Sequence, residues 1–197
     1  CISAEQMLYI AANNSMAKLS EIVGDDKSKF EKEAQILKEK VNAFFWDGEK
    51  GAYIDNYESG KRNVTRHANI FAILYDIASK EQAESICKNV LFNDEIEKIT
   101  TPYFEGYELE VMGKLSEFDF IENKIRTYWK GMLDLGATTV WEEFDPSLTG
   151  DEHYAMYGKK YDKSLCHAWG AAPIYLLGRF FMGVYPTSPG FETFSVK

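Results

Sequence analysis

The most constraining feature of the sequence is a succession of helical segments in which largely apolar and amphipathic members alternate. Residues 2–23 and 66–78 carry few charges, whereas residues 26–45 and 80–90 place Lys and Glu along one face. The pairs recur at intervals of roughly 40 residues, which is typical of helical hairpins stacked side by side. The pattern predicts inner apolar helices and outer amphipathic ones, as in a solenoid or an α/α barrel.

The remaining chain extends this all-α prediction to about seven helices. Further helices are expected over residues 103–115, 117–133 and 164–184, with a long loop over residues 136–162 and a short β-hairpin or extended loop over residues 46–57. Within residues 2–23, helical spacing predicts one apolar face made of Leu8, Ala12, Ser15, Leu19 and Ile22. A closed toroid of six hairpins needs twelve helices, so the chain would supply slightly more than half of one.

Charge and hydropathy exclude several classes of partner. The chain has 31 acidic and 22 basic residues and a formal net charge of −9, which disfavours nucleic acid and anionic membrane surfaces. The most apolar stretch, residues 164–184, contains His167, Pro173 and Arg179, so we expect a buried helix and not a membrane span. Aromatic residues make up 15% of the chain. An acidic, aromatic-rich protein is compatible with carbohydrate ligands, whose rings pack on aromatic faces and whose hydroxyls bind carboxylates.

The sequence predicts neither a metal nor a cofactor. Its three cysteines are widely spaced, and no Cys or His cluster has the spacing of zinc ligands. It also lacks the P-loop, dinucleotide-binding, zinc-protease and α/β-hydrolase motifs. The compartment stays open between cytoplasm, periplasm and secretion.

One stretch concentrates the side chains of acid–base chemistry. A helix is expected to end near Gly136, after which Trp141, Glu142, Glu143 and Asp145 follow within ten residues. Glycoside hydrolysis needs two carboxyl groups in different protonation states, and a neighbouring ring shifts one of them by desolvation. The alternative is an acidic surface loop anchored by its tryptophan.

Two further stretches could line a cleft. His167 and Trp169 would lie in the first turns of the last helix if Ser164 is its N-cap, and His167 would then bind a ligand hydroxyl or be a satisfied core residue. Tyr103, Glu105 and Tyr107 follow Pro102 at the start of another helix, where they could line a cleft. The alternative is that the two rings pack in the core and the glutamate caps the helix. His67 and His153 are expected to be structural or exposed.

Three motifs in order resemble the end of the catalytic domain of bacterial α-L-rhamnosidases. They are the run from Gly136 through Thr138, Thr139 and Trp141 to Glu142, the run Ser164-Leu-Cys-His-Ala-Trp169, and the run from Gly183 to Phe191. The segment that begins Thr101-Pro-Tyr-Phe fits the same pattern. The chain departs from many members at Glu143, Phe144 and Cys166, where they have Arg, Trp and Asn; the base is retained and the exact sugar is left open.

The resemblance implies part of an (α/α)6 barrel that hydrolyses terminal α-L-rhamnosides with inversion. Glu142 would be the general base and His167 a sugar ligand, with Trp141, Trp169 and Tyr103 completing the sugar-binding site. The family's general acid lies in an acidic loop that precedes this region, so we expect it outside the chain. Residues 1–185 would be the C-terminal portion of the catalytic domain, and residues 186–197 the start of a linker or strand leading to a β-domain.

Other functions are compatible with the same fold. The alternatives are another six-hairpin glycosidase, of the fucosidase or glucosidase type, and a carbohydrate-binding or helical interaction domain without catalysis. The expected partners are a carbohydrate substrate and the rest of the chain's own catalytic domain. In isolation we expect the chain to be inactive and to associate with copies of itself, with a solvated Glu142 whose pKa stays near that of a free glutamate.

Overall fold

The computed structural model describes residues 2–58 and 60–197 and divides the chain into two compact units, residues 1–98 and 99–197. Both are mainly helical, as predicted. The predicted division at residue 185 stays a prediction, and residues 186–197 contribute a strand to the second unit.

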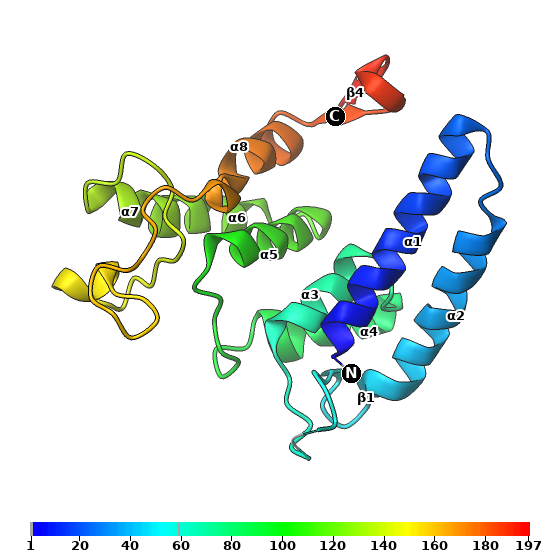
Figure 1. Ribbon diagram of the computed structural model, residues 1–197, viewed down its shortest axis with the longest axis horizontal. Helices are drawn as coiled ribbons and strands as arrows, with labels where there is room; N and C mark the ends of the chain where they lie inside the picture. The colour runs from blue at the N-terminus through cyan, green and yellow to red at the C-terminus, as the bar shows by residue number, and fades with distance from the viewer. Residues whose placement is uncertain (1, 59) are drawn as a thin grey trace. The chain divides into compact units, whose positions relative to one another are not determined.

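The first unit begins with an antiparallel helical hairpin of α1 (Ser3–Val23) and α2 (Ser28–Phe45), drawn in dark and light blue in Figure 1. Gly24 ends α1 with a φ of 81°, a conformation that glycine adopts without strain. Strands β1 (Trp46–Asp47) and β2 (Ala52–Tyr53) form the predicted β-hairpin. Helices α3 (Arg66–Leu74) and α4 (Lys80–Ile86) complete the unit, and α4 continues as a π-helical turn, Cys87–Leu91.

The predicted apolar face of α1 is wrong. The buried apolar side chains are Met7, Ile10 and Ala17, whereas Leu8, Leu19 and Ile22 are exposed. Apolar residues occur on two sides of this helix, and helical spacing alone cannot tell which side packs against α2 and α3.

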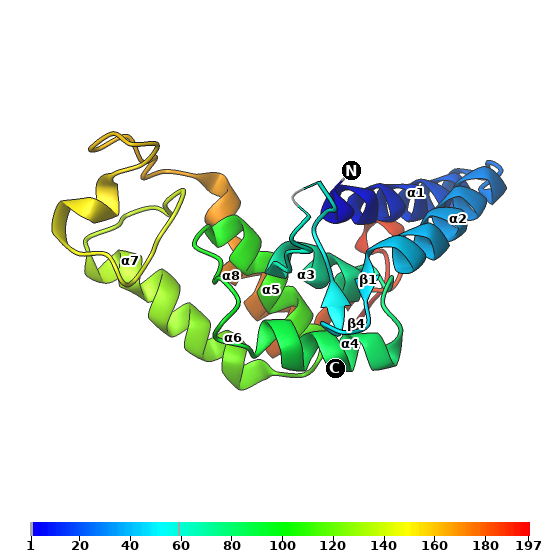
Figure 2. The ribbon, with the colours of Figure 1, turned by 90° about the horizontal axis from the view of Figure 1, so that it is seen from below.

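The second unit is built around α5 (Pro102–Lys114) and a long helix drawn in lighter green in Figure 2. That long helix comprises α6 (Phe118–Lys124), a π-helical turn (Ile125–Trp129) and α7 (Lys130–Asp134). If these three are counted as one, the described residues form seven helices, in agreement with the sequence. The long loop that follows contains a 3-10 turn, Gly150–Tyr154.

The last helix differs from its prediction at both ends. Helix α8 (Ala172–Leu176) follows a 3-10 turn, Ala168–Gly170, and continues as a π-helical turn, Leu177–Phe181. Ser164 is therefore not its N-cap. Strands β3 (Val184–Pro186) and β4 (Phe194–Val196) pair antiparallel around a 3-10 turn, Pro189–Phe191.

Helix α8 is also less buried than predicted. Leu176 is fully buried, but Ile174 is 81% exposed, and Tyr175, Leu177 and Met182 are exposed as well. Its close approach to α5 depends on small residues, because a Cβ added to Gly106 would lie 2.8 Å from the Cβ of Ala172. A Cβ on Gly113 would likewise meet the Phe180 ring at 2.4 Å. These glycines let the two helices pack closely. The close packing sets the position of the segment around Trp169 relative to α5.

Candidate active site

Two of the predicted motifs lie side by side in the second unit. The amide of Glu142 donates to the carbonyl of Ser164 over 2.9 Å, and the amide of His167 donates to the carbonyl of Val140 over 2.8 Å. The Thr139 hydroxyl adds a bond to the carbonyl of Leu165. Residues 139–142 and 164–167 are thus paired through their backbones, which places the predicted base next to the predicted sugar ligand.

The Glu142 carboxylate is held by two donors. The Tyr157 hydroxyl donates to Oε1 over 2.9 Å, and the Ser164 amide donates to Oε2 over 3.1 Å. The residue is 8% exposed, so the expectation of a fully solvated Glu142 is wrong. The Ser164 amide lowers the pKa of Glu142 most; the Tyr157 hydroxyl and the charges of His167 and Lys163 lower it further, against the opposing effect of burial.

The neighbouring carboxylates have partners elsewhere. Glu143 accepts a bond from the Thr100 hydroxyl over 3.1 Å and lies 3.4 Å from the amine of Lys163, whose side chain is 0% exposed. Asp145 accepts bonds from the amide and hydroxyl of Ser147, which lower its pKa. Of the three predicted carboxylates, Glu142 is the buried one, and Glu143 and Asp145 are half-buried.

Trp169 connects Glu142 to the other predicted ligands. Its indole N–H donates to the carbonyl of Glu142 over 3.2 Å. Its ring lies 4.1 Å from that of His167 and stacks on Tyr103 at 5.4 Å. His167 precedes the 3-10 turn in an extended conformation and therefore reaches this cluster from a loop, not from a helix.

Trp141 takes a different position. It is 3% exposed and packs against Phe144 and Tyr154. His153 is buried too and stacks on Phe144, as the structural interpretation predicted. These four rings pack together as one cluster, in which Trp141 and Phe144 flank Glu142 and Glu143 in the sequence.

A cleft of about 210 Å³ opens beside Trp169, between α5 and the start of α8. Tyr103 and Tyr107, for which the sequence left a cleft or the core open, line this cleft, whereas Glu105 is buried and lies 2.9 Å from the amine of Lys124. Sequence reasoning missed Glu110 and Tyr175. Tyr107 and Glu110 lie at helical spacing from Tyr103, and the Tyr175 hydroxyl donates to Glu110 over 2.9 Å. Burial, followed by that bond, raises the pKa of Tyr175 to about 12. The i, i+4, i+7 spacing of Tyr103, Tyr107 and Glu110 was the signal that could have found Glu110.

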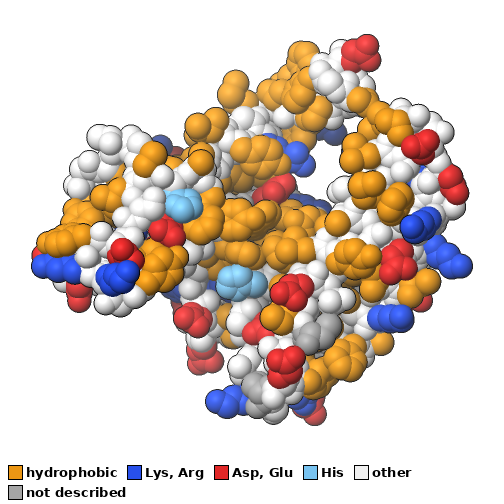
Figure 3. All heavy atoms as spheres, in the orientation of Figure 1, with side chains coloured by type: hydrophobic (Ala, Val, Ile, Leu, Met, Phe, Trp, Pro, Cys, Tyr) orange, Lys and Arg blue, Asp and Glu red, His pale blue; other side chains and the backbone are white. Residues whose placement is uncertain are grey.

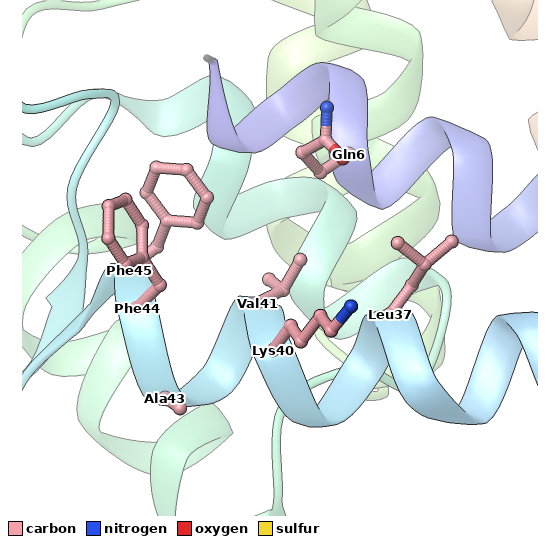
Figure 4. Close-up of a pocket in the computed structure, with 7 residues that line it drawn as sticks. All are labelled: Gln6, Leu37, Lys40, Val41, Ala43, Phe44 and Phe45. Atoms are coloured by element: carbon pink, nitrogen blue, oxygen red, sulfur yellow. The ribbon is translucent and has the colours of Figure 1, made fainter.

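A larger pocket, of about 430 Å³, lies in the first unit (Figure 4). It is lined by Leu37, Val41, Phe44 and other residues of α2, with Gln6 from α1 and Lys40 as its charged residue. It contains no carboxylate and no histidine, so it lacks the groups for acid–base chemistry, and the smaller cleft is the better candidate.

The described part of the chain offers neither a metal-binding cluster nor a membrane-spanning helix. Residues 2–58 and 60–197 contain no group of three or more His, Cys, Asp or Glu side chains that could hold a metal ion. Cys166 is an exposed free thiol. None of the helices described is long and apolar enough to cross a membrane.

Two rhamnosidases are among the solved structures that match the fold. A rhamnosidase from Klebsiella oxytoca, solved with rhamnose bound, is 25% identical with a TM-score of 0.77, over 91% of this chain and 34% of that one. The GH78 family rhamnosidase of Bacillus sp. GL1 is also 25% identical, with a TM-score of 0.84, over 100% of this chain and 21% of that one. The chain thus spans about a third and a fifth of these two proteins. A search of curated protein sequences gives no match.

The family assignment comes from the sequence as a whole. The model of the bacterial α-L-rhamnosidase six-hairpin glycosidase domain matches residues 3–180, which is most of the chain. This range includes both motifs that pair around Glu142. The chain belongs to the bacterial α-L-rhamnosidase six-hairpin glycosidase domain family.

Proposed function

We propose that this chain is part of a glycoside hydrolase that removes terminal α-L-rhamnosyl groups. The observation that carries the proposal is the Glu142 carboxylate, held by the Tyr157 hydroxyl and the Ser164 amide next to His167 and Trp169. The family, and a relative solved with rhamnose bound, support rhamnose as the sugar.

In the proposed reaction, inversion needs a base and an acid at the same time. Glu142 takes a proton from water while the water oxygen bonds to the anomeric carbon and the glycosidic C–O bond breaks. A carboxylic acid gives its proton to the leaving oxygen, so one water is consumed and the net protonation of the two groups is restored by exchange. The two carboxyl groups would lie about 6.5–9.5 Å apart to admit the water.

The general acid is proposed to come from outside this chain. A general acid needs a raised pKa, so that it is protonated near neutral pH. Asp145 is unsuited, because the Ser147 donors lower its pKa. Glu143 is engaged by the buried Lys163 and by Thr100.

The remaining predicted residues take binding roles in this proposal. His167 would hold a sugar hydroxyl with its half-buried ring, while Trp169 and Tyr103 would form an aromatic wall of the cleft. Trp141 would shape the site from behind, since its ring is buried against Phe144 and Tyr154.

A panel of nitrophenyl glycosides tests the proposal against its alternatives. The full-length protein that contains this chain should release nitrophenol from the α-L-rhamnoside and leave the α-L-fucoside and α-glucoside almost intact. Preference for either of those sugars would indicate another six-hairpin glycosidase. Binding of rhamnose in calorimetry without turnover of any glycoside would indicate a carbohydrate-binding domain, and absence of both would indicate a helical interaction domain.

A further inference from the structure

An exposed tyrosine that no sequence motif singled out contacts the proposed base. Tyr157 lies in the long loop, fifteen residues after Glu142, and is 73% exposed. Burial therefore does little to hold this side chain in place. Its hydroxyl nevertheless donates to Oε1 of Glu142 over 2.9 Å.

The backbone presents Tyr157 on a tight turn. Met156 and Lys159 form an antiparallel bridge, with amide-to-carbonyl bonds of 3.0 and 2.9 Å in the two directions. The two residues between them, Tyr157 and Gly158, have positive φ of 52° and 76°. Two such residues are typical of a two-residue β-hairpin turn, and a tyrosine there is strained where glycine or asparagine would be relaxed.

The contact restricts how Glu142 can act. An ionised carboxylate has about four acceptor positions. Tyr157 fills one on Oε1 and the Ser164 amide fills one on Oε2, so the plane of the carboxylate is fixed at both oxygens. A water to be deprotonated must approach one of the remaining positions, and its direction is set by these two donors.

We propose that Tyr157 is a positioning residue, whose hydroxyl orients the Glu142 carboxylate toward the attacking water. The inference rests on the proposed function of Glu142 and adds a residue to that site. Tyr157 would touch neither the water nor the anomeric carbon; it acts through Glu142. His167 and Lys163 also bear on the charge of Glu142, and Glu143 and Asp162 on that of Tyr157, so the test leaves all four unchanged.

The kinetic test compares Tyr157→Phe with Tyr161→Phe in the full-length protein. Tyr161 is an exposed tyrosine of the same loop whose hydroxyl donates to Asp151, so it is a matched control outside the site. Tyr157→Phe should lower kcat on nitrophenyl α-L-rhamnoside by roughly 10- to 100-fold, the value of one hydrogen bond to a charged group, with little change in KM. Tyr161→Phe should leave both constants unchanged.

The pH profile supplies a readout that a merely structural role would not move. A bond from the Tyr157 hydroxyl stabilises the ionised form of Glu142, so its removal raises the Glu142 pKa. The acid limb of kcat/KM should therefore move to higher pH in Tyr157→Phe and stay in place in Tyr161→Phe. Wild-type kcat together with an unmoved acid limb in Tyr157→Phe would overturn the proposal.

A third measurement needs no turnover. Ultraviolet titration of phenolate absorbance, with Tyr157→Phe subtracted from wild type, isolates the ionisation of Tyr157. The Glu142 carboxylate raises the pKa of Tyr157, so the titration should occur at lower pH in a Glu142→Gln background. An identical titration in both backgrounds would overturn the contact. Absence of glycosidase activity in wild type would overturn the proposed function, while this titration still decides whether Tyr157 holds Glu142.

Discussion

Glu142 and Glu143 are adjacent in sequence but face different surroundings. Glu142 is held by an amide and a phenol, whereas Glu143 lies against the buried Lys163 amine. The first environment suits an ionised base, and the second compensates a buried positive charge. The two residues therefore respond differently to the same substitution.

Glu142→Gln should lower kcat by a factor on the order of 10²–10⁴, the usual contribution of a general acid or base. Substrate binding and folding should survive, because the amide keeps the shape of the side chain and the Tyr157 hydroxyl can accept from its NH₂ group. Glu143→Gln should keep most of the activity and lower the melting temperature, since Lys163 loses its carboxylate partner. Steady-state kinetics and thermal unfolding of both variants check this. A larger loss of kcat in Glu143→Gln would show that the base is misassigned.

The pH dependence of activity follows from the sign of the Glu142 pKa shift. The base must be ionised in the free enzyme, and its pKa is lowered from the ordinary value of 4.5. The midpoint of the acid limb of kcat/KM should therefore lie below pH 4.5. The same group stabilises the fold above its unfolded pKa, and this contribution is lost as the pH falls through the lower folded value. A pH–rate profile in buffers of constant ionic strength measures this midpoint. A midpoint well above pH 4.5 would contradict the assignment of Glu142 as the base.

His167→Ala should weaken rhamnose binding more than it weakens the fold. Its backbone bond to Val140 does not involve the side chain, and its half-buried ring contacts Trp169 at the cleft. His153→Ala is the matched control, because that ring is buried against Phe144 away from the cleft lining. Calorimetric titration with rhamnose and thermal unfolding separate the two. A large loss of stability with unchanged affinity in His167→Ala would support a core histidine.

At the scale of residues, the sequence predicted the site residues that belong to local motifs. It missed the site residue that contacts between distant parts of the loop bring to Glu142. Glu142 and His167 could be singled out because each belongs to a recognisable run of residues. Tyr157 could not, because its contact with Glu142 depends on a turn whose place is set by the whole loop. The binding roles of Tyr103, Trp141 and Trp169 stay predictions.

At the scale of elements, one side chain fastens strand β2 to helix α3. The buried Asn69 accepts from the amide of Tyr53 over 2.9 Å and donates to its carbonyl over 3.0 Å. A strand of two residues has few ladder bonds of its own. The Asn69 amide therefore satisfies buried backbone groups that the short hairpin leaves unpaired.

Asn69→Ala should destabilise this hairpin by about 3 kcal/mol, because two buried backbone groups lose their partner. Local opening should then increase by roughly two decades, which hydrogen exchange of a peptide covering residues 46–57 would detect. Asn14→Ala, on an exposed position of α1, should leave that exchange unchanged. Equal protection of the peptide in Asn69→Ala and wild type would contradict the role of this side chain.

The helix bounds were predicted well where apolar spacing and end signals agree. They were predicted poorly where a segment pairs its backbone with a distant segment instead of forming a helix. Helix α5 begins at Pro102, within a residue of its prediction, because proline is favoured in a first turn. Residues 164–167 were expected to be helical, but their backbone pairs with residues 139–142 instead. Pro173, in the first turn of α8, was the local signal of the true start.

At the scale of the whole molecule, apolar side chains reach the surface of both units (Figure 3). In the first unit they include Leu8, Leu19 and Ile22 of α1, and in the second Ile174 and Met182. Contiguous exposed apolar surface is typical of sites that contact other protein. The rest of the catalytic domain, predicted from the sequence as a partner, would supply such contacts.

The final prediction concerns the 197 residues by themselves, which should fold in part yet fail to hydrolyse nitrophenyl α-L-rhamnoside. Inversion requires an acid as well as the Glu142 base, and the acid is proposed to lie outside these residues. The exposed apolar side chains should cause the chain to associate, because association removes them from water. Light scattering should then give the mass of dimers or larger species, and an assay at high protein concentration should give no nitrophenol. Circular dichroism controls for folding and should be dominated by helix. Clear turnover by a monomer would contradict both the external acid and the need for further parts of the domain.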